Sequence, residues 1–158
     1  MKEISVFLFG VLFSFMSIDS MASGGNSTEI ISCTLPGELS RKVSLSIDNK
    51  TKEINYSFEK EGKVELAVLF NEENKLKRLT DSKMGVTYYG FKRGAYSYIV
   101  DIVNGAEQEE YTISFDIKKN NKVVQSDDCL HSSFRSADIT SKYISDVPYV
   151  DGDNFAFP

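Results

Sequence analysis

The chain of 158 residues contains no tryptophan, one histidine, two cysteines and three prolines. A single histidine leaves little room for catalysis by a histidine base, and the cysteines and histidine together are too few for a four-ligand zinc site. The net charge is −5, and the basic residues are dispersed rather than gathered in a stripe, which excludes general binding to nucleic acid. A hydrophobic content of 41% is typical of a folded domain rather than a disordered chain.

Long apolar runs are also missing, apart from one at the N-terminus. Ile4–Met16 is apolar over about 13 residues, and Ser20-Met21-Ala22 places small side chains at the −3 and −1 positions of a cut before Ser23. This layout predicts a secretory signal peptide over residues 1–22. A membrane-spanning helix needs roughly 20 apolar residues. We therefore expect a periplasmic or secreted protein with no membrane span.

The predicted export determines the expected chemical state of the two cysteines. In an oxidising compartment Cys33 and Cys129 are expected to form a disulfide, because no third thiol competes. A loop this long would stabilise the fold by about 4–5 kcal/mol in the chain-entropy model. The alternative is a nucleophilic thiol with His131 nearby, but no third orienting group is evident.

After a Ser/Gly-rich start, the chain is a series of short alternating segments separated by turn residues. Val43, Leu45 and Ile47 alternate with polar residues, which is typical of a half-buried strand. In segment 64–70 both alternating sets are largely apolar, which predicts a strand covered on both faces. The predicted strands are 31–35, 43–47, 54–58, 64–70, 76–79, 86–91, 95–103, 111–117 and 123–126.

This regular spacing predicts an all-β fold, an antiparallel sandwich or small barrel of about eight strands. The stretch Ser132–Ile144 is expected to be irregular or to hold a short helix. Tyr149, Phe155 and Phe157 are expected to dock on the domain, the alternative being an exposed recognition tail. The expected organisation is a signal peptide (1–22), a disulfide-stapled β domain (23–130) and a docked C-terminal tail (131–158).

Catalytic and metal-binding patterns are scarce. There is no Gly-x-Ser-x-Gly turn, and an acidic chain of this size contains many carboxylate pairs without a sign that two face one cleft. Asp151-Gly152-Asp153-Asn154 has oxygen ligands at short spacing but lacks the rest of a calcium loop, so a terminal turn is the better interpretation. We expect no metal, no cofactor and no enzymatic activity.

The order of several motifs is similar to that of a known family. Cys33 followed by segments 54–58, 64–66, 88–91 and 94–98 resembles small periplasmic proteins of Gram-negative bacteria. The order of Cys33, alternating strands, Ser82-x-x-Gly85-x-x-Tyr88, a basic residue before Gly94 and a final Cys129 is also similar to that of the periplasmic C-type lysozyme inhibitors. In those inhibitors a Ser/Gly/Tyr loop and a Lys-Gly turn enter the active cleft of the enzyme. The resemblance implies the same role for this chain, with Arg93 in place of the lysine. A fimbrial subunit fits less well, because its cysteines lie closer in sequence and it has a penultimate Tyr, whereas this chain ends Phe157-Pro158.

The sequence therefore favours a protein-binding inhibitor or immunity protein that neutralises a cell-wall hydrolase or a competitor's toxin. The acidic stretch 107–110 is a second candidate contact, since an acidic loop attracts a basic partner. The alternatives are a small hydrolase with a carboxylate pair and a small-ligand carrier. The expected partner contacts are Ser82, Gly85, Tyr88, Lys92, Arg93, Glu107, Glu109 and Glu110.

Overall fold

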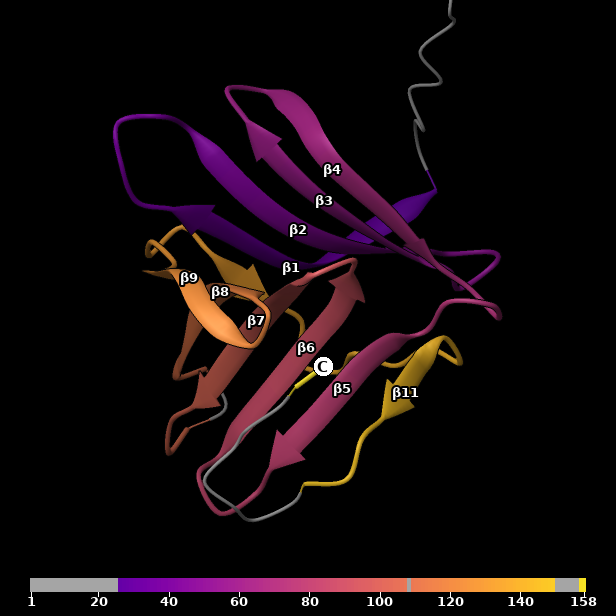
Figure 1. Ribbon diagram of the computed structural model, residues 1–158. Coiled ribbons are helices and arrows are strands. Elements are labelled where there is room, and N and C mark those ends of the chain that lie inside the picture. The colour runs from indigo at the N-terminus through magenta and orange to yellow at the C-terminus, as the bar shows by residue number, and fades with distance from the viewer. Residues whose placement is uncertain (1–25, 108, 150–156) are drawn as a thin grey trace, which may run out of the picture.

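Eleven strands and no helix form in the parts of the chain that the computed structural model describes, residues 26–107, 109–149 and 157–158. The predicted signal peptide, Phe155 and the Asp151–Asn154 segment lie outside these residues. The strands pack as two sheets, one above the other in Figure 1, so the all-β sandwich is confirmed and the barrel alternative is not.

The first sheet, sheet A, is antiparallel throughout and has β4 at one edge. Its strands, in spatial order, are β10 (Phe134–Arg135), β1 (Ser27–Leu35), β2 (Arg41–Asp48), β3 (Ile54–Lys60) and β4 (Lys63–Phe70). The second sheet, sheet B, is antiparallel except for β11, which pairs in parallel with β5. Its strands, in spatial order, are β11 (Ile144–Asp146), β5 (Leu76–Asp81), β6 (Val86–Arg93), β7 (Tyr96–Asn104), β8 (Tyr111–Lys119) and β9 (Lys122–Asp128).

Aromatic rings from both sheets fill the core in the absence of tryptophan. The ring of Tyr56 on β3 lies 4.8 Å from that of Phe91 on β6, and Phe58 stacks on Phe115 of β8 at 6.2 Å. Phe70 and Phe115 are fully buried. The period-two patterns of β3 and β8 therefore place their large side chains on the inner faces of the two sheets.

The predicted disulfide is present and joins the two sheets. Cys33 lies on β1 and Cys129 directly follows β9, with their Cα atoms 5.2 Å apart. Because both cysteines are in this bond, the alternative of a nucleophilic thiol is wrong.

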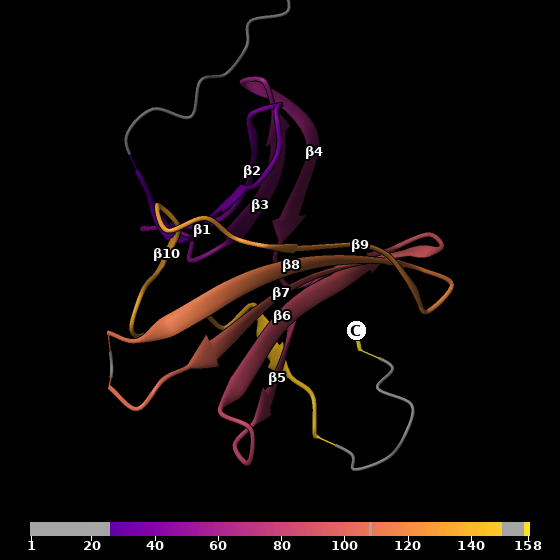
Figure 2. The ribbon, with the colours of Figure 1, turned by 90° about the vertical axis from the view of Figure 1, so that its left-hand side faces the viewer.

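Residues 130–147, which follow the disulfide, connect the two sheets, and we call this segment the strap. It adds β10 to the edge of sheet A, crosses to sheet B and adds β11 beside β5 (Figures 1 and 2). The stretch Ser132–Ile144 contains no helix, so the prediction of an irregular segment is confirmed and that of a short helix is wrong. Further along, Phe157 is buried against Leu79 and Ile99 on the outer face of sheet B. Gly90 makes room for it, since a Cβ there would lie 2.9 Å from the Phe157 ring.

Candidate functional site

Two of the predicted contact regions meet at one end of sheet B. The turn between β5 and β6 carries Ser82 and Gly85, and the loop between β7 and β8 carries three exposed glutamates. The two are joined through Asn104, whose backbone N and side-chain Nδ2 donate to the Gly85 carbonyl at 2.9 and 3.2 Å. We call this region the acidic end, defined by Ser82, Gly85, Glu107, Glu109 and Glu110.

Hydrogen bonds within the β7–β8 loop fix its shape. The Gly105 amide donates to the Glu110 carbonyl at 2.6 Å, and the Glu110 amide donates to the Glu107 carbonyl at 3.0 Å. A Cβ at Gly105 would lie 2.5 Å from the Glu110 Cβ, so this close approach requires glycine. The glutamate side chains of this loop therefore project from a backbone that is fixed by hydrogen bonds.

Two surface hollows flank Tyr111 beside this loop. The larger, about 620 Å³, is lined by the acidic residues Glu109 and Asp128 together with apolar Ile113 and Leu130. The other, about 420 Å³, is lined by Val103 and by Glu110 among others. Leu130 is 45% exposed and Val103 38%. Apolar surface surrounded by charge is the composition of a protein-binding patch.

The backbone beside the larger hollow is tied to both sheets. The Cys129 amide donates to the Ile113 carbonyl on β8, and the Leu130 amide donates to the Thr34 carbonyl on β1, each at 2.8 Å. His131, the lone histidine, is exposed and lines the same hollow. A surface tied in this way loses little conformational entropy when it binds a partner.

Lys92 and Arg93 lie at the opposite end of sheet B. The eight residues of β6 separate Gly85 from Arg93 by about 25 Å at the usual rise of a strand. The turns at the two ends point away from each other in Figure 2. The two motifs of the inhibitor-like resemblance, the Ser/Gly/Tyr loop and the basic turn, are therefore not brought together.

Two lysines that the sequence reasoning missed join this basic end. Strand pairing aligns Arg93 with Tyr96, Tyr96 with Lys119, and Lys119 with Lys122. The Lys119 ammonium lies 5.4 Å from the centre of the Tyr96 ring. The turn 119–122 was visible in the sequence, but only the strand order reveals that it adjoins the turn at Lys92-Arg93. Sheet B thus carries opposite charge at its two ends.

Tyr88, the remaining predicted contact, lies on the outer face of β6. Burial and the nearby charge of Asp101 raise the pKa of its hydroxyl. Burial also raises the pKa of Asp101 to about 6, and Asp116 on the neighbouring strand adds to the rise. Among the described residues, Asp101 and Asp116 most resemble a catalytic pair of carboxyls, and the sequence did not indicate them. Neither side chain lines the hollows beside Tyr111.

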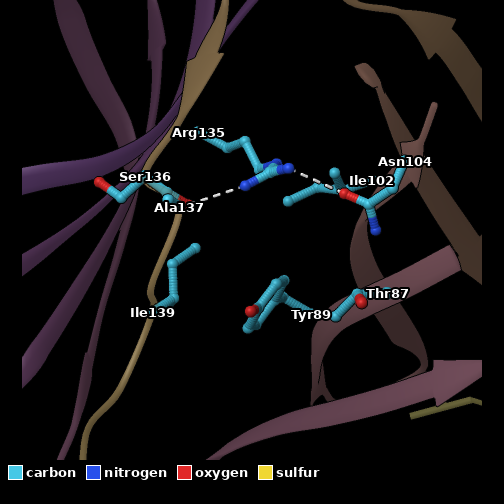
Figure 3. Close-up of a pocket in the computed structure, with 8 residues that line it drawn as sticks. All are labelled: Thr87, Tyr89, Ile102, Asn104, Arg135, Ser136, Ala137 and Ile139. Atoms are coloured by element: carbon cyan, nitrogen blue, oxygen red, sulfur yellow. Dashed lines mark hydrogen bonds between the residues drawn. The ribbon is translucent and has the colours of Figure 1, made fainter. Parts of the chain in front are cut away.

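A narrower groove separates the strap from sheet B. In Figure 3 Arg135 reaches from the strap towards Asn104, and Tyr89 and Thr87 on β6 lie opposite Ile139. The hollow holds about 210 Å³. The Arg135 guanidinium donates to the Asn104 side-chain oxygen at 2.9 Å and lies 4.8 Å from the centre of the Tyr111 ring.

The groove continues towards β11, where a second arginine ties the strap down. Arg78 donates to both carboxylate oxygens of Asp146, at 2.6 and 3.0 Å, and to the Ile139 carbonyl at 3.1 Å. The hydrogen bonds between the two side chains, with their opposite charges adding to the effect, lower the pKa of Asp146 and raise that of Arg78. This part of the groove holds about 270 Å³. Both arginines therefore hold the strap against sheet B.

Comparison with family models, with curated proteins and with solved structures finds no match for this chain. Within residues 26–107, 109–149 and 157–158, no three side chains of the metal-binding types gather closely enough to hold an ion. In the same residues no helix has the length and apolar character to cross a membrane.

Proposed function

We propose that this protein is exported to the periplasm, where its acidic end binds a basic surface of another protein. It would act as an inhibitor or immunity protein that neutralises a cell-wall hydrolase or a toxin delivered by a competitor. The observation that carries the proposal is the pair of hollows beside Glu109, which combine carboxyls with exposed apolar side chains on a hydrogen-bonded backbone.

Electrostatics supports a basic partner. The chain carries a net charge of −5, and Glu107, Glu109 and Glu110 are all exposed at the acidic end. Complementary charge increases the rate of encounter and disfavours partners of the wrong sign. The apolar side chains Val103 and Leu130 then supply surface that is buried on binding.

The carrier alternative has less support. The two hollows of the groove, about 210 and 270 Å³, are smaller than the 300–1,000 Å³ typical of small-molecule sites. Hollows of about 620, 540 and 420 Å³ fall in that range, but they lie open on the surface. Arg78 and Arg135, which face this groove, are engaged with Asp146 and Asn104.

A hydrolase is a second candidate, favoured by Asp101 and Asp116. Its support is a carboxyl, Asp101, whose pKa of about 6 suits a general acid and which has a second carboxyl nearby. The test is wall-polysaccharide hydrolysis by the purified protein. Activity that Asp101→Asn abolishes would favour the hydrolase, and no activity above a buffer control would reject it.

A capture experiment tests the binding proposal. The mature protein is immobilised and offered purified basic wall hydrolases, a C-type lysozyme among them, and toxins encoded beside its gene. We expect it to bind and inhibit at least one of them. We expect the triple variant Glu107→Gln, Glu109→Gln, Glu110→Gln to lose that binding.

The matched control has the same change in net charge on sheet A, at Glu38→Gln, Glu61→Gln and Glu65→Gln, three exposed positions. It should bind as the unmodified protein does. Failure to bind any of the candidates, or equal loss in both triple variants, would contradict the proposal.

A further inference from the structure

The edge of sheet A formed by β4 has an unusual composition for a free edge. Residues 66–70 read Leu-Ala-Val-Leu-Phe, with no charge and no proline. Among the described residues β4 pairs only with β3, and it lies at the outer border of the sheet in Figure 1. The alternation of this segment predicts burial of both faces, yet Leu69 is 44% exposed and Ala67 is exposed as well.

In sheet B, by contrast, the edge strand has features that prevent it from pairing with another strand. Its edge strand β9 has a bulge beside Val124 and carries Lys122, Asp127 and Asp128 along its length. Charges and bulges are the usual devices that prevent one edge from pairing with another. In β4 the bulge lies at Glu65, outside the apolar stretch, so residues 66–70 stay regular.

The apolar stretch of β4 is complementary to itself when two copies run antiparallel. With Val68 facing Val68, Leu66 faces Phe70, and Ala67 on the outer face meets Leu69 of the other copy. Each large side chain of the outer face is then opposite a small one. Antiparallel pairs of this kind are the unit of sheet stabilisation.

The charges at the two ends of β4 favour the same orientation. At its start Lys63 lies between Glu61 and Glu65, and after its end Glu73 lies between Glu72 and Lys75, which form an ion pair at 3.3 Å. The acidic turn is held beside the strand, because Asn74 Nδ2 donates to the Leu69 carbonyl at 3.2 Å. With Val68 facing Val68, antiparallel pairing brings Lys63 of one copy towards Glu73 of the other, and Glu61 towards Lys75. In-register parallel pairing would align each charge with its like.

We propose that β4 is the contact surface of a homodimer, in which two copies pair antiparallel through residues 66–70 and join their A sheets into one continuous sheet. The symmetric contact closes on itself, so it forms a dimer rather than a filament. Both acidic ends belong to sheet B and take no part in this contact. An edge of five residues buries less than the 1,200–2,000 Å² of a stable interface, so the dimer dissociates on dilution.

Sedimentation velocity over a range of concentrations tests the dimer. We expect the mature protein to shift from monomer to dimer as concentration rises. Leu69→Lys should weaken association about tenfold or more, because each dimer loses two apolar cross-strand pairs. Val123→Lys, a matched change at a 56% exposed site on β9, should leave association unchanged.

Charge reversal tests the orientation. Lys63→Glu should weaken the dimer, and adding Glu73→Lys in the same chain should restore it. Thermal unfolding of each variant confirms that it folds. A protein that stays monomeric at all concentrations, or a dimer that Leu69→Lys does not weaken, would overturn the proposal.

Discussion

At the scale of single residues, two tyrosine hydroxyls have opposite roles in stability. The hydroxyl of Tyr56 is buried in the core with no hydrogen-bond partner among the described residues, and burial raises its pKa. The hydroxyl of Tyr111 accepts a hydrogen bond from the Arg135 amide at 3.3 Å, and its ring contacts the guanidinium of the same residue. An unsatisfied buried hydroxyl costs free energy, whereas a satisfied one contributes it.

Replacement of each tyrosine by phenylalanine should therefore have opposite results. Tyr56→Phe is expected to raise the free energy of unfolding by about 1 kcal/mol, and Tyr111→Phe to lower it by about 1 kcal/mol. Urea denaturation measures both. A loss of stability in Tyr56→Phe would mean that the hydroxyl has a partner, such as a buried water molecule.

Asp101 should make stability depend on pH. Its folded pKa of about 6 lies above the value of about 3.9 in an unfolded chain, so the folded state holds its proton more tightly. The contribution of this carboxyl is then most favourable below pH 4 and is lost as pH rises through 6. Because the side chain is partly exposed, we discount the effect to about 1 kcal/mol.

Asp101→Asn tests this linkage. The variant should match the unmodified protein near pH 4 and be more stable than it at pH 7. The measurement is the difference between the two free energies of unfolding across this range. A difference that does not change with pH would show that Asp101 titrates normally.

At the scale of the elements, the disulfide is the main covalent tie between the sheets. It closes a separation of 96 residues, and Cys33 is fully buried. Without it, the segment around Leu130 would be held to β1 by hydrogen bonds alone, among them Leu130 N to the Thr34 carbonyl and the Thr34 amide to Ser133 Oγ. The strap also relies on the Arg78–Asp146 pair at its far end.

The double variant Cys33→Ala, Cys129→Ala should therefore lose about 4–5 kcal/mol of stability, or less if the reduced chain retains structure. Urea denaturation with and without reductant measures the loss. In the unmodified protein, intact mass should show two hydrogens fewer than the reduced chain. Two free thiols in protein taken from the periplasm would contradict the disulfide.

The sequence predicts some of these elements far better than others. The long strands follow from alternation, which is clear in 43–47 and 111–117. Strands β10 and β11 have two and three residues, too few for any period, and they form only because the strap crosses both sheet edges. This pairing also explains why Ser132–Ile144 forms no helix.

The site was predictable only in part. Glu107–Glu110 stood out as an acidic run. The predicted strand 86–91 already separates Gly85 from Arg93, because Gly85 directly precedes β6 and Arg93 ends it. The proximity of Leu130 to this loop depends on the disulfide. Asp101 and Asp116 become neighbours through the register of β7 and β8, which no local pattern reveals.

At the scale of the whole molecule, charge is unevenly distributed over sheet B. Glutamates gather at the β7–β8 loop, and Lys92, Arg93, Lys119 and Lys122 gather at the opposite end. A basic partner approaching this field is oriented towards the acidic end before contact. Salt should therefore slow association while changing dissociation less.

The most direct test of the central claim is inhibition of a captured wall hydrolase, measured as the rate of wall hydrolysis against added protein. We predict inhibition by the unmodified protein and by the sheet A control, and a rightward shift of at least about tenfold for the acidic-end triple variant. Equal inhibition by all three proteins would contradict binding through the acidic end.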